Sequence, residues 1–159
     1  MKLSITSPAF ENDGVIPAKY TCDGGNMNPP LTISDIPEGT VSLAIIMDDP
    51  DVPKVLKPDG MFDHWVVYSI PVEPGQTLLE IPEASAPGVQ GVNGRGQEAY
   101  TGPCPPPEYE PSEHRYFFKV YALSTELTFL APPAKTEVEA AMNGFIIGSS
   151  ELIGRYARQ

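Results

Sequence analysis

Three short segments of the chain carry residue types that could do chemistry, and both histidines lie within them. The segments are 48–53, 62–65 and 102–116, which read DDPDVP, FDHW and GPCPPPEYEPSEHRY. Carboxylates, imidazoles, a thiol and a phenol can exchange protons and make hydrogen bonds. Each segment lies where an apolar run begins or ends, which is where polar groups gather at the rim of a sheet. This grouping predicts a pocket at one end of a sheet.

Proline dominates the third segment. Residues 100–116 hold five of the nineteen prolines of the chain. Each proline ring fixes φ and removes a backbone donor, so this segment can form neither a helix nor an interior strand. We expect a stiff loop, which suits ligand binding because it has little entropy left to lose when a ligand arrives.

The charge of the chain limits its partners. The formal net charge is −11 over 159 residues, so the protein repels both phosphodiester backbones and anionic membrane faces. We therefore expect no nucleic acid partner and no membrane insertion. A small anionic ligand would need a small, enclosed site in which local backbone N–H groups and histidine oppose the overall field.

The length is typical of one domain, predicted to span residues 1–159. The first ten residues lack the apolar core of a signal peptide, and the longest uncharged runs are too short to cross a bilayer. These features predict a cytoplasmic protein. In that compartment Cys22 and Cys104 are expected to be free thiols, although an oxidising environment would allow them to pair.

The predominant predicted element is the β-strand. Runs rich in β-branched and aromatic residues predict strands at 2–6, 41–49, 64–71 and 114–123. One helix is expected after residue 134, with a capping box formed by Thr136 and Glu139. Gly144 would end it, and residues 150–158 would return as a strand or a second short helix. The apolar stripe of the helix comprises Val138, Ala141, Met142 and Phe145.

The run 114–123 is apolar on both faces. Tyr116, Phe118, Val120 and Ala122 alternate along one face, and Phe117, Tyr121 and Leu123 lie along the other. A strand with two apolar faces belongs in the middle of a layered structure. The pattern predicts either two packed antiparallel sheets or one sheet covered by the helix.

The motifs DDPDVP, DHWVVYSIP and GPCPP, followed by HRYFFKVYAL, occur in this order with wide spacing. Together they resemble the phosphatidylethanolamine-binding protein (PEBP) family, also called the Raf kinase inhibitor protein family, in its smaller bacterial and archaeal form. The opening segment 3–31 and the closing helix and tail are similar to that form as well. Asp63 and the segment EAYTG at 98–102 depart from the family pattern, which affects the expected ligand preference.

The resemblance implies a mostly β fold: a sandwich of two antiparallel sheets with one short C-terminal helix and a terminal strand. It also implies a small anion pocket and a homodimer, and no cofactor is expected. A metal site formed by the two histidines and an aspartate is disfavoured, because residues on separated strands give no ligand-spacing motif. The residues that match the family pocket are Asp49, Asp51, His64, Gly102, Cys104, Pro105, Pro106, His114 and Tyr116.

The chemistry of these residues suggests a role for each. His64 and Tyr116 can donate hydrogen bonds to a phosphate-like oxygen, and the backbone N–H groups of Gly102 and Cys104 can add others. Asp49 would repel an anion directly. We therefore expect Asp49 to orient a histidine or a loop N–H group, or to accept a hydrogen bond from the amine of an ethanolamine-like head group.

Three functional hypotheses follow. The leading one is a non-enzymatic protein that binds phosphate or a phospholipid head group and modulates a kinase or a protease, as the family name implies. A hydrolase that uses Cys104 and His64 is a second, and a protein-interaction module that docks a partner on the pocket rim is a third. Structural interpretations stay open: the acidic segment as a simple turn, His64 as an ordinary strand residue, His114 as an exposed residue and Cys104 as a small filler.

Overall fold

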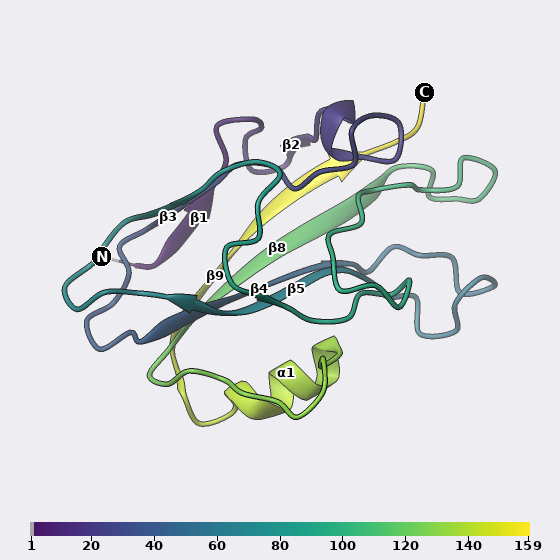
Figure 1. The fold of residues 1–159 in the computed structure, drawn as a ribbon. Helices are drawn as coiled ribbons and strands as arrows, with labels where there is room; N and C mark the ends of the chain where they lie inside the picture. Colours follow the sequence, from purple (N-terminus) through teal and green to yellow (C-terminus); the bar gives the residue numbers. More distant parts are fainter. Residues whose placement is uncertain (1) are drawn as a thin grey trace.

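Two β-sheets packed face to face form the framework of the protein, as seen in a computed structural model that describes residues 2–159 (Figure 1). The smaller sheet has three strands, in the order β1 (Ser4–Thr6), β3 (Leu31–Ser34) and β6 (Leu79–Ile81). The larger sheet has six strands, in the order β2 (Gly14–Val15), β9 (Ile146–Tyr156), β8 (His114–Leu123), β4 (Ser42–Asp49), β5 (Phe62–Pro71) and β7 (Val89–Gln90). Two short helices, η1 (Ala18–Tyr20) and α1 (Lys135–Met142), complete the fold.

The predicted fold class is confirmed. Neighbouring strands are antiparallel in both sheets except for the short β2–β9 pair, which is parallel. The structure has one helix of the α type near the C-terminus, followed by a terminal strand. The predicted strands correspond to β1, β4, β5 and β8, and β8 has the bounds expected from its alternating pattern.

Both layers predicted around β8 are present. The face that carries Tyr116, Phe118, Val120 and Ala122 is fully buried against the three-stranded sheet and belongs to the main core. On the other face Leu123 joins a second apolar cluster with Val138 and Met142 of α1. The larger sheet is thus covered by the smaller sheet on one side and by α1 on the other, which Figure 1 shows.

The N-terminal cap of helix α1 lies two residues before the predicted cap, Thr136. Its N-terminal cap is Ala134, whose backbone N–H donates to the Glu137 side chain, so the predicted pairing of Thr136 with Glu139 is wrong. Val138 and Met142 are buried as predicted, whereas Phe145 lies beyond the helix and is half exposed. Gly144 has a φ of +90° and follows the end of the helix, as its sequence position predicted.

Strands β4 and β5 direct polar side chains to both faces of the larger sheet at one end. Asp48 opposes Asp63 and faces α1, whereas Asp49 opposes Phe62 on the other face. The register between the two strands shifts next to Met47, which opposes Trp65. Strand β5 has one extra residue, His64, between the residues that oppose Met47 and Asp48. The extra residue reverses the alternation of side chains between the two faces of β5, so His64 and Trp65 both lie on the side of the main core.

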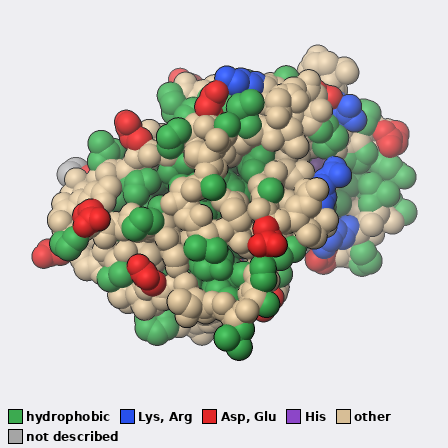
Figure 2. Space-filling view, viewed as in Figure 1, with side chains coloured by type: hydrophobic (Ala, Val, Ile, Leu, Met, Phe, Trp, Pro, Cys, Tyr) green, Lys and Arg blue, Asp and Glu red, His purple; other side chains and the backbone are tan. Residues whose placement is uncertain are grey.

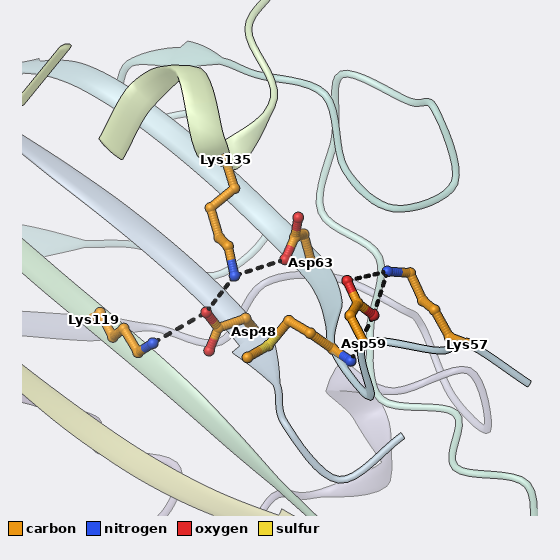
Figure 3. A network of polar contacts seen from close by, with 7 residues as sticks. Asp48, Lys57, Asp59, Asp63, Lys119 and Lys135 are labelled. Carbon is orange, nitrogen blue, oxygen red and sulfur yellow. Dashed lines mark hydrogen bonds and ion pairs between the residues drawn. The ribbon is translucent and has the colours of Figure 1, made fainter. Parts of the chain in front are cut away.

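Asp48 and Asp63 hold α1 against the sheet through a shared lysine (Figure 3). The Lys135 ammonium lies 3.1 Å from a carboxylate oxygen of each, and Lys119 also lies 3.1 Å from Asp48. Asp48 is only 1% exposed and Lys135 only 11%. Burial lowers the pKa of Lys135, but the two carboxylates outweigh burial and raise it overall. Lys135 therefore stays charged and neutralises a buried carboxylate.

Replacing Lys135 by methionine should destabilise the protein, because Asp48 would remain buried with one cation fewer. Loss of one partner of a buried ion pair costs about 3 kcal/mol. The matched control is Lys57→Met, which breaks the exposed Lys57–Asp59 pair also drawn in Figure 3 and should cost less than about 1 kcal/mol. Guanidinium unfolding of both variants provides the measurement. Equal losses in the two variants would show that the buried network does not stabilise the docking of α1.

Candidate functional site

A small cavity of about 160 Å³ lies at one end of the sandwich, where the loops around β4, β5 and β8 meet. Figure 2 shows that most of the Lys and Arg side chains visible on this face gather at the right-hand end, which carries these loops in Figure 1. The residues that line the cavity are Asp49, Val52, Phe62, His64, Arg95, Gly102, Cys104, Pro105, Pro106, His114 and Tyr116.

Eight of the nine predicted pocket residues line this cavity, and Asp51 does not. Asp51 instead forms a two-pronged ion pair with Arg115, with both N···O distances at 2.9 Å. Hydrogen bonding from Arg115 lowers the pKa of Asp51. The structure thus assigns Asp51 to fixing the start of β8. Sequence reasoning missed Val52, Phe62 and Arg95 as lining residues. Val52 and Phe62 lie within the singled-out segments 48–53 and 62–65, whereas Arg95 had no such signal.

Asp49 and His114 form the polar centre of the cavity. His114 Nδ1 lies 2.6 Å from one Asp49 oxygen, and the backbone N–H of Asp51 donates to the other at 2.8 Å. Both side chains are almost fully buried, so the alternative of an exposed His114 is wrong. As expected for Asp49, its carboxylate orients a histidine and a loop N–H group. His114 Nε2 is left buried without a hydrogen-bond partner among residues 2–159.

His64 is held in one tautomer. Its Nδ1 lies 2.7 Å from the carbonyl oxygen of Thr101, which can only accept, so Nδ1 carries the hydrogen. Burial lowers the pKa of His64, and the ring is therefore neutral at neutral pH. In this state Nε2 is an acceptor. The expectation that His64 donates to a phosphate oxygen thus holds only if the ring gains a proton when the ligand binds.

Tyr116 supplies the clearest donor. Its side chain is completely buried, and its hydroxyl has no partner among the described residues. Burial raises the pKa of Tyr116, so the hydroxyl keeps its proton. The ring packs edge-on against His64, with centroids 5.2 Å apart, and stacks near His114 at 6.3 Å. The cavity therefore has a fixed hydroxyl donor between its two imidazoles.

The proline-rich loop lies close against the segment that follows η1. A Cβ atom on Gly102 would lie 2.4 Å from the carbonyl oxygen of Tyr20, so only glycine fits. The Gly102 N–H donates to the Asn26 side chain, which rules out the predicted donation to an anion. The N–H of Cys104 has no hydrogen-bond partner among residues 2–159. It is therefore a backbone donor without a protein partner, on a residue that lines the cavity.

Cys22 and Cys104 form a disulfide with a Cα–Cα distance of 5.4 Å, so the prediction of two free thiols is wrong. No local pattern indicates that the close packing of the two loops brings these distant residues together. The thiol required by the hydrolase hypothesis is therefore bonded in this structure. Disulfides are typical of oxidising compartments, and the cytoplasmic location stays a prediction. No helix formed by residues 2–159 has the length and apolar character needed to cross a bilayer.

A family model described as phosphatidylethanolamine-binding protein matches residues 6–157 of the chain. The chain belongs to the PEBP family. Similar proteins include a UPF0098 protein of Aquifex aeolicus, 44% identical over 98% of this chain and 89% of that protein. A UPF0098 protein of Methanothermobacter thermautotrophicus is 42% identical over 98% of this chain and 99% of that protein.

Two solved structures resemble this PEBP closely. One is a PEBP homolog, CT736 from Chlamydia trachomatis, with a TM-score of 0.88, 38% identity and 99% coverage of both chains. The other is YbcL of E. coli, described as a new member of the mammalian PEBP family, with a TM-score of 0.83, 29% identity and full coverage of both chains. These matches confirm the family and the fold inferred from the motifs.

Removing the disulfide should lower the stability of this PEBP, because the bond closes a long loop between residues 82 positions apart. The double variant Cys22→Ser/Cys104→Ser should lose about 2 to 4 kcal/mol of unfolding free energy. Guanidinium unfolding with and without a reductant measures this loss. The reductant should destabilise the unmodified chain and leave the double variant unchanged. Two titratable thiols in the oxidised, unmodified chain would contradict the disulfide.

Stability should also fall in mild acid because of His64. Its folded pKa lies below the unfolded value of about 6.5, so its contribution is complete above that pH and is lost as pH falls. Between about pH 7.5 and 5 the unmodified chain should lose up to about 2 kcal/mol more than His64→Gln. Denaturant unfolding at both pH values gives the comparison. Parallel pH profiles for the two proteins would rule out a buried neutral His64.

Proposed function

We propose that this PEBP is a non-enzymatic binding protein whose cavity holds a small phosphate-containing anion. The observation that carries the proposal is a pair of buried polar atoms at the cavity, the Tyr116 hydroxyl and His114 Nε2, that have no partner among residues 2–159. A buried polar group without a partner costs about 1 to 3 kcal/mol. A ligand oxygen placed between these atoms would recover part of that cost.

The donors favour an oxygen-rich ligand. The protonated Tyr116 hydroxyl and the N–H of Cys104 can donate to a ligand oxygen, while neutral His64 accepts from an oxygen or nitrogen that carries a proton. A phosphate group offers both kinds of oxygen when it carries one proton. Asp49 offers little repulsion to such a ligand, because both of its oxygens already accept hydrogen bonds from the protein.

The size of the cavity supports a head group as the ligand. Pockets for drug-sized ligands occupy roughly 300 to 1,000 Å³, and this cavity has about 160 Å³. A phosphate or phosphoethanolamine group fits this space better than a whole nucleotide. The disulfide and the prolines of the lining loop keep the site in shape before the ligand arrives, which reduces the entropic cost of binding.

The disulfide between Cys104 and Cys22 weighs against the hydrolase hypothesis, since a nucleophilic cysteine needs a free thiolate. The modulation of a kinase or protease and the homodimer stay predictions. A His64 substitution separates the two remaining hypotheses. If it abolishes binding of a partner protein as well as binding of phosphate, the cavity rim is a docking site; if only phosphate binding is lost, the cavity serves a small ligand.

Tyr116→Phe should weaken phosphate binding about tenfold, because one buried hydrogen bond to a charged group is lost. Calorimetric or NMR titration of the protein with inorganic phosphate and phosphoethanolamine measures the affinity. The matched control is Tyr121→Phe, on the α1 side of the same strand, which should leave the affinity unchanged. Equal affinities in all three proteins, or no response of the His64 and Tyr116 resonances at millimolar ligand, would count decisively against the proposal.

A further inference from the structure

Arg95 is the cavity residue that neither the motifs nor the family resemblance indicated. It is the one Lys or Arg among the residues that line the cavity. The other three arginines of the chain each form an ion pair, with Asp51, Glu113 and Asp23 respectively. Among residues 2–159 no carboxylate lies within ion-pair distance of Arg95. Its guanidinium is therefore free to meet a ligand.

The turn that carries Arg95 is fixed even though the side chain is exposed. The Asn93 side chain is buried and accepts hydrogen bonds from the backbone N–H groups of Arg95 and Gln97. The same side chain donates to the carbonyl of Ala99. A Cβ atom on Gly94 would lie 2.7 Å from the ring of Phe62, so glycine lets the turn pack against the cavity wall. The position of Arg95 beside the cavity is thus built into the fold.

The side chains inside the cavity cannot by themselves balance the charge of a doubly negative ligand. Asp49 brings a carboxylate next to His114, and His64 is held neutral by burial. The nearby Arg115 is already paired with Asp51. A ligand with a second negative charge therefore depends on Arg95, in a chain whose net charge is −11. The planar guanidinium suits this task, since it can donate two parallel hydrogen bonds to phosphate oxygens.

We propose that Arg95 makes the cavity selective for a terminal phosphomonoester over a phosphodiester. This inference rests on the proposed function of the cavity. A phosphomonoester has a second pKa of about 6 and is mostly dianionic at neutral pH, whereas a diester has one charge. It also has three terminal oxygens, against two in a diester. Tyr116 and the N–H of Cys104 at the cavity and Arg95 at its edge can each donate to one oxygen of the dianion, whereas neutral His64 offers only an acceptor at Nε2.

Titration of the full chain with methyl phosphate and dimethyl phosphate, at about pH 7.5 where the monoester is dianionic, tests the selectivity. We expect methyl phosphate to bind at least about tenfold more tightly than dimethyl phosphate. Arg95→Gln should weaken methyl phosphate binding about tenfold and dimethyl phosphate binding threefold or less. Arg95→Lys keeps the charge but loses the planar guanidinium, so its affinity for methyl phosphate should lie between those of the unmodified chain and Arg95→Gln.

The control is Lys54→Gln, which removes one positive charge from the loop between β4 and β5 at a residue that does not line the cavity. It should change both affinities less than about twofold, because its charge is exposed and screened. If Arg95→Gln weakens the binding of both compounds equally, or of neither, while the unmodified chain still binds phosphate, the result contradicts the selectivity proposed for Arg95. The proposed anion site would then remain supported. If the unmodified chain binds neither compound, the proposed function fails together with the selectivity.

A second arm identifies the source of the phosphomonoester. Vesicles of phosphatidylcholine with and without phosphatidic acid carry the same group on a lipid surface. Co-sedimentation that requires both phosphatidic acid and Arg95 would assign the lipid head group. Methyl phosphate binding without co-sedimentation would assign a soluble phosphomonoester, which the acidic surface of the protein favours. If the Arg95→Gln variant co-sediments as well as the unmodified chain, the result would contradict the proposed selectivity.

Discussion

The alternation of side chains across the larger sheet is the constraint on which the cavity depends. Asp48 and Asp49 are neighbours in the sequence, yet one reaches the lysines beneath α1 and the other reaches His114 in the cavity. Asp63 and His64 divide in the same way on the next strand. The sheet thus has a carboxylate network on one face and the cavity on the other. Because β4 and β5 carry both, the lysines that neutralise Asp48 and Asp63 also help to hold the cavity wall in place.

The cavity resolves an apparent conflict between its acidic residues and an anionic ligand. Asp49 uses both oxygens within the protein, and Asp51 is neutralised by Arg115. Neither carboxylate is left free to compete with the ligand for donors. What faces the cavity is a protonated hydroxyl, two imidazole nitrogens and one unpaired guanidinium. The acidic motif therefore serves to orient the donors, which its composition alone does not reveal.

Features that depend on local pattern could be predicted from the sequence. The alternation of β8 predicted both its bounds and its two buried faces, and eight of the residues that the family resemblance implied line the cavity. Features that depend on contacts between distant loops could not. The Cys22–Cys104 bond arises because Gly102 permits close packing on Tyr20. Arg95 reaches the cavity through a turn organised by Asn93, and the cap of α1 uses the backbone of Ala134, which has no polar side chain to reveal it.

Rigidity and charge have separate origins in this site. The lining loop is held by a disulfide, by prolines and by a glycine contact, all of which act without charge and persist at any ionic strength. In the proposed site, attraction for a doubly charged ligand would come from Arg95, which is exposed and therefore screened by salt. Rising salt should consequently erode discrimination between mono- and diesters before it abolishes binding. The buried donors act at short range, where hydrogen bonds depend little on dissolved ions.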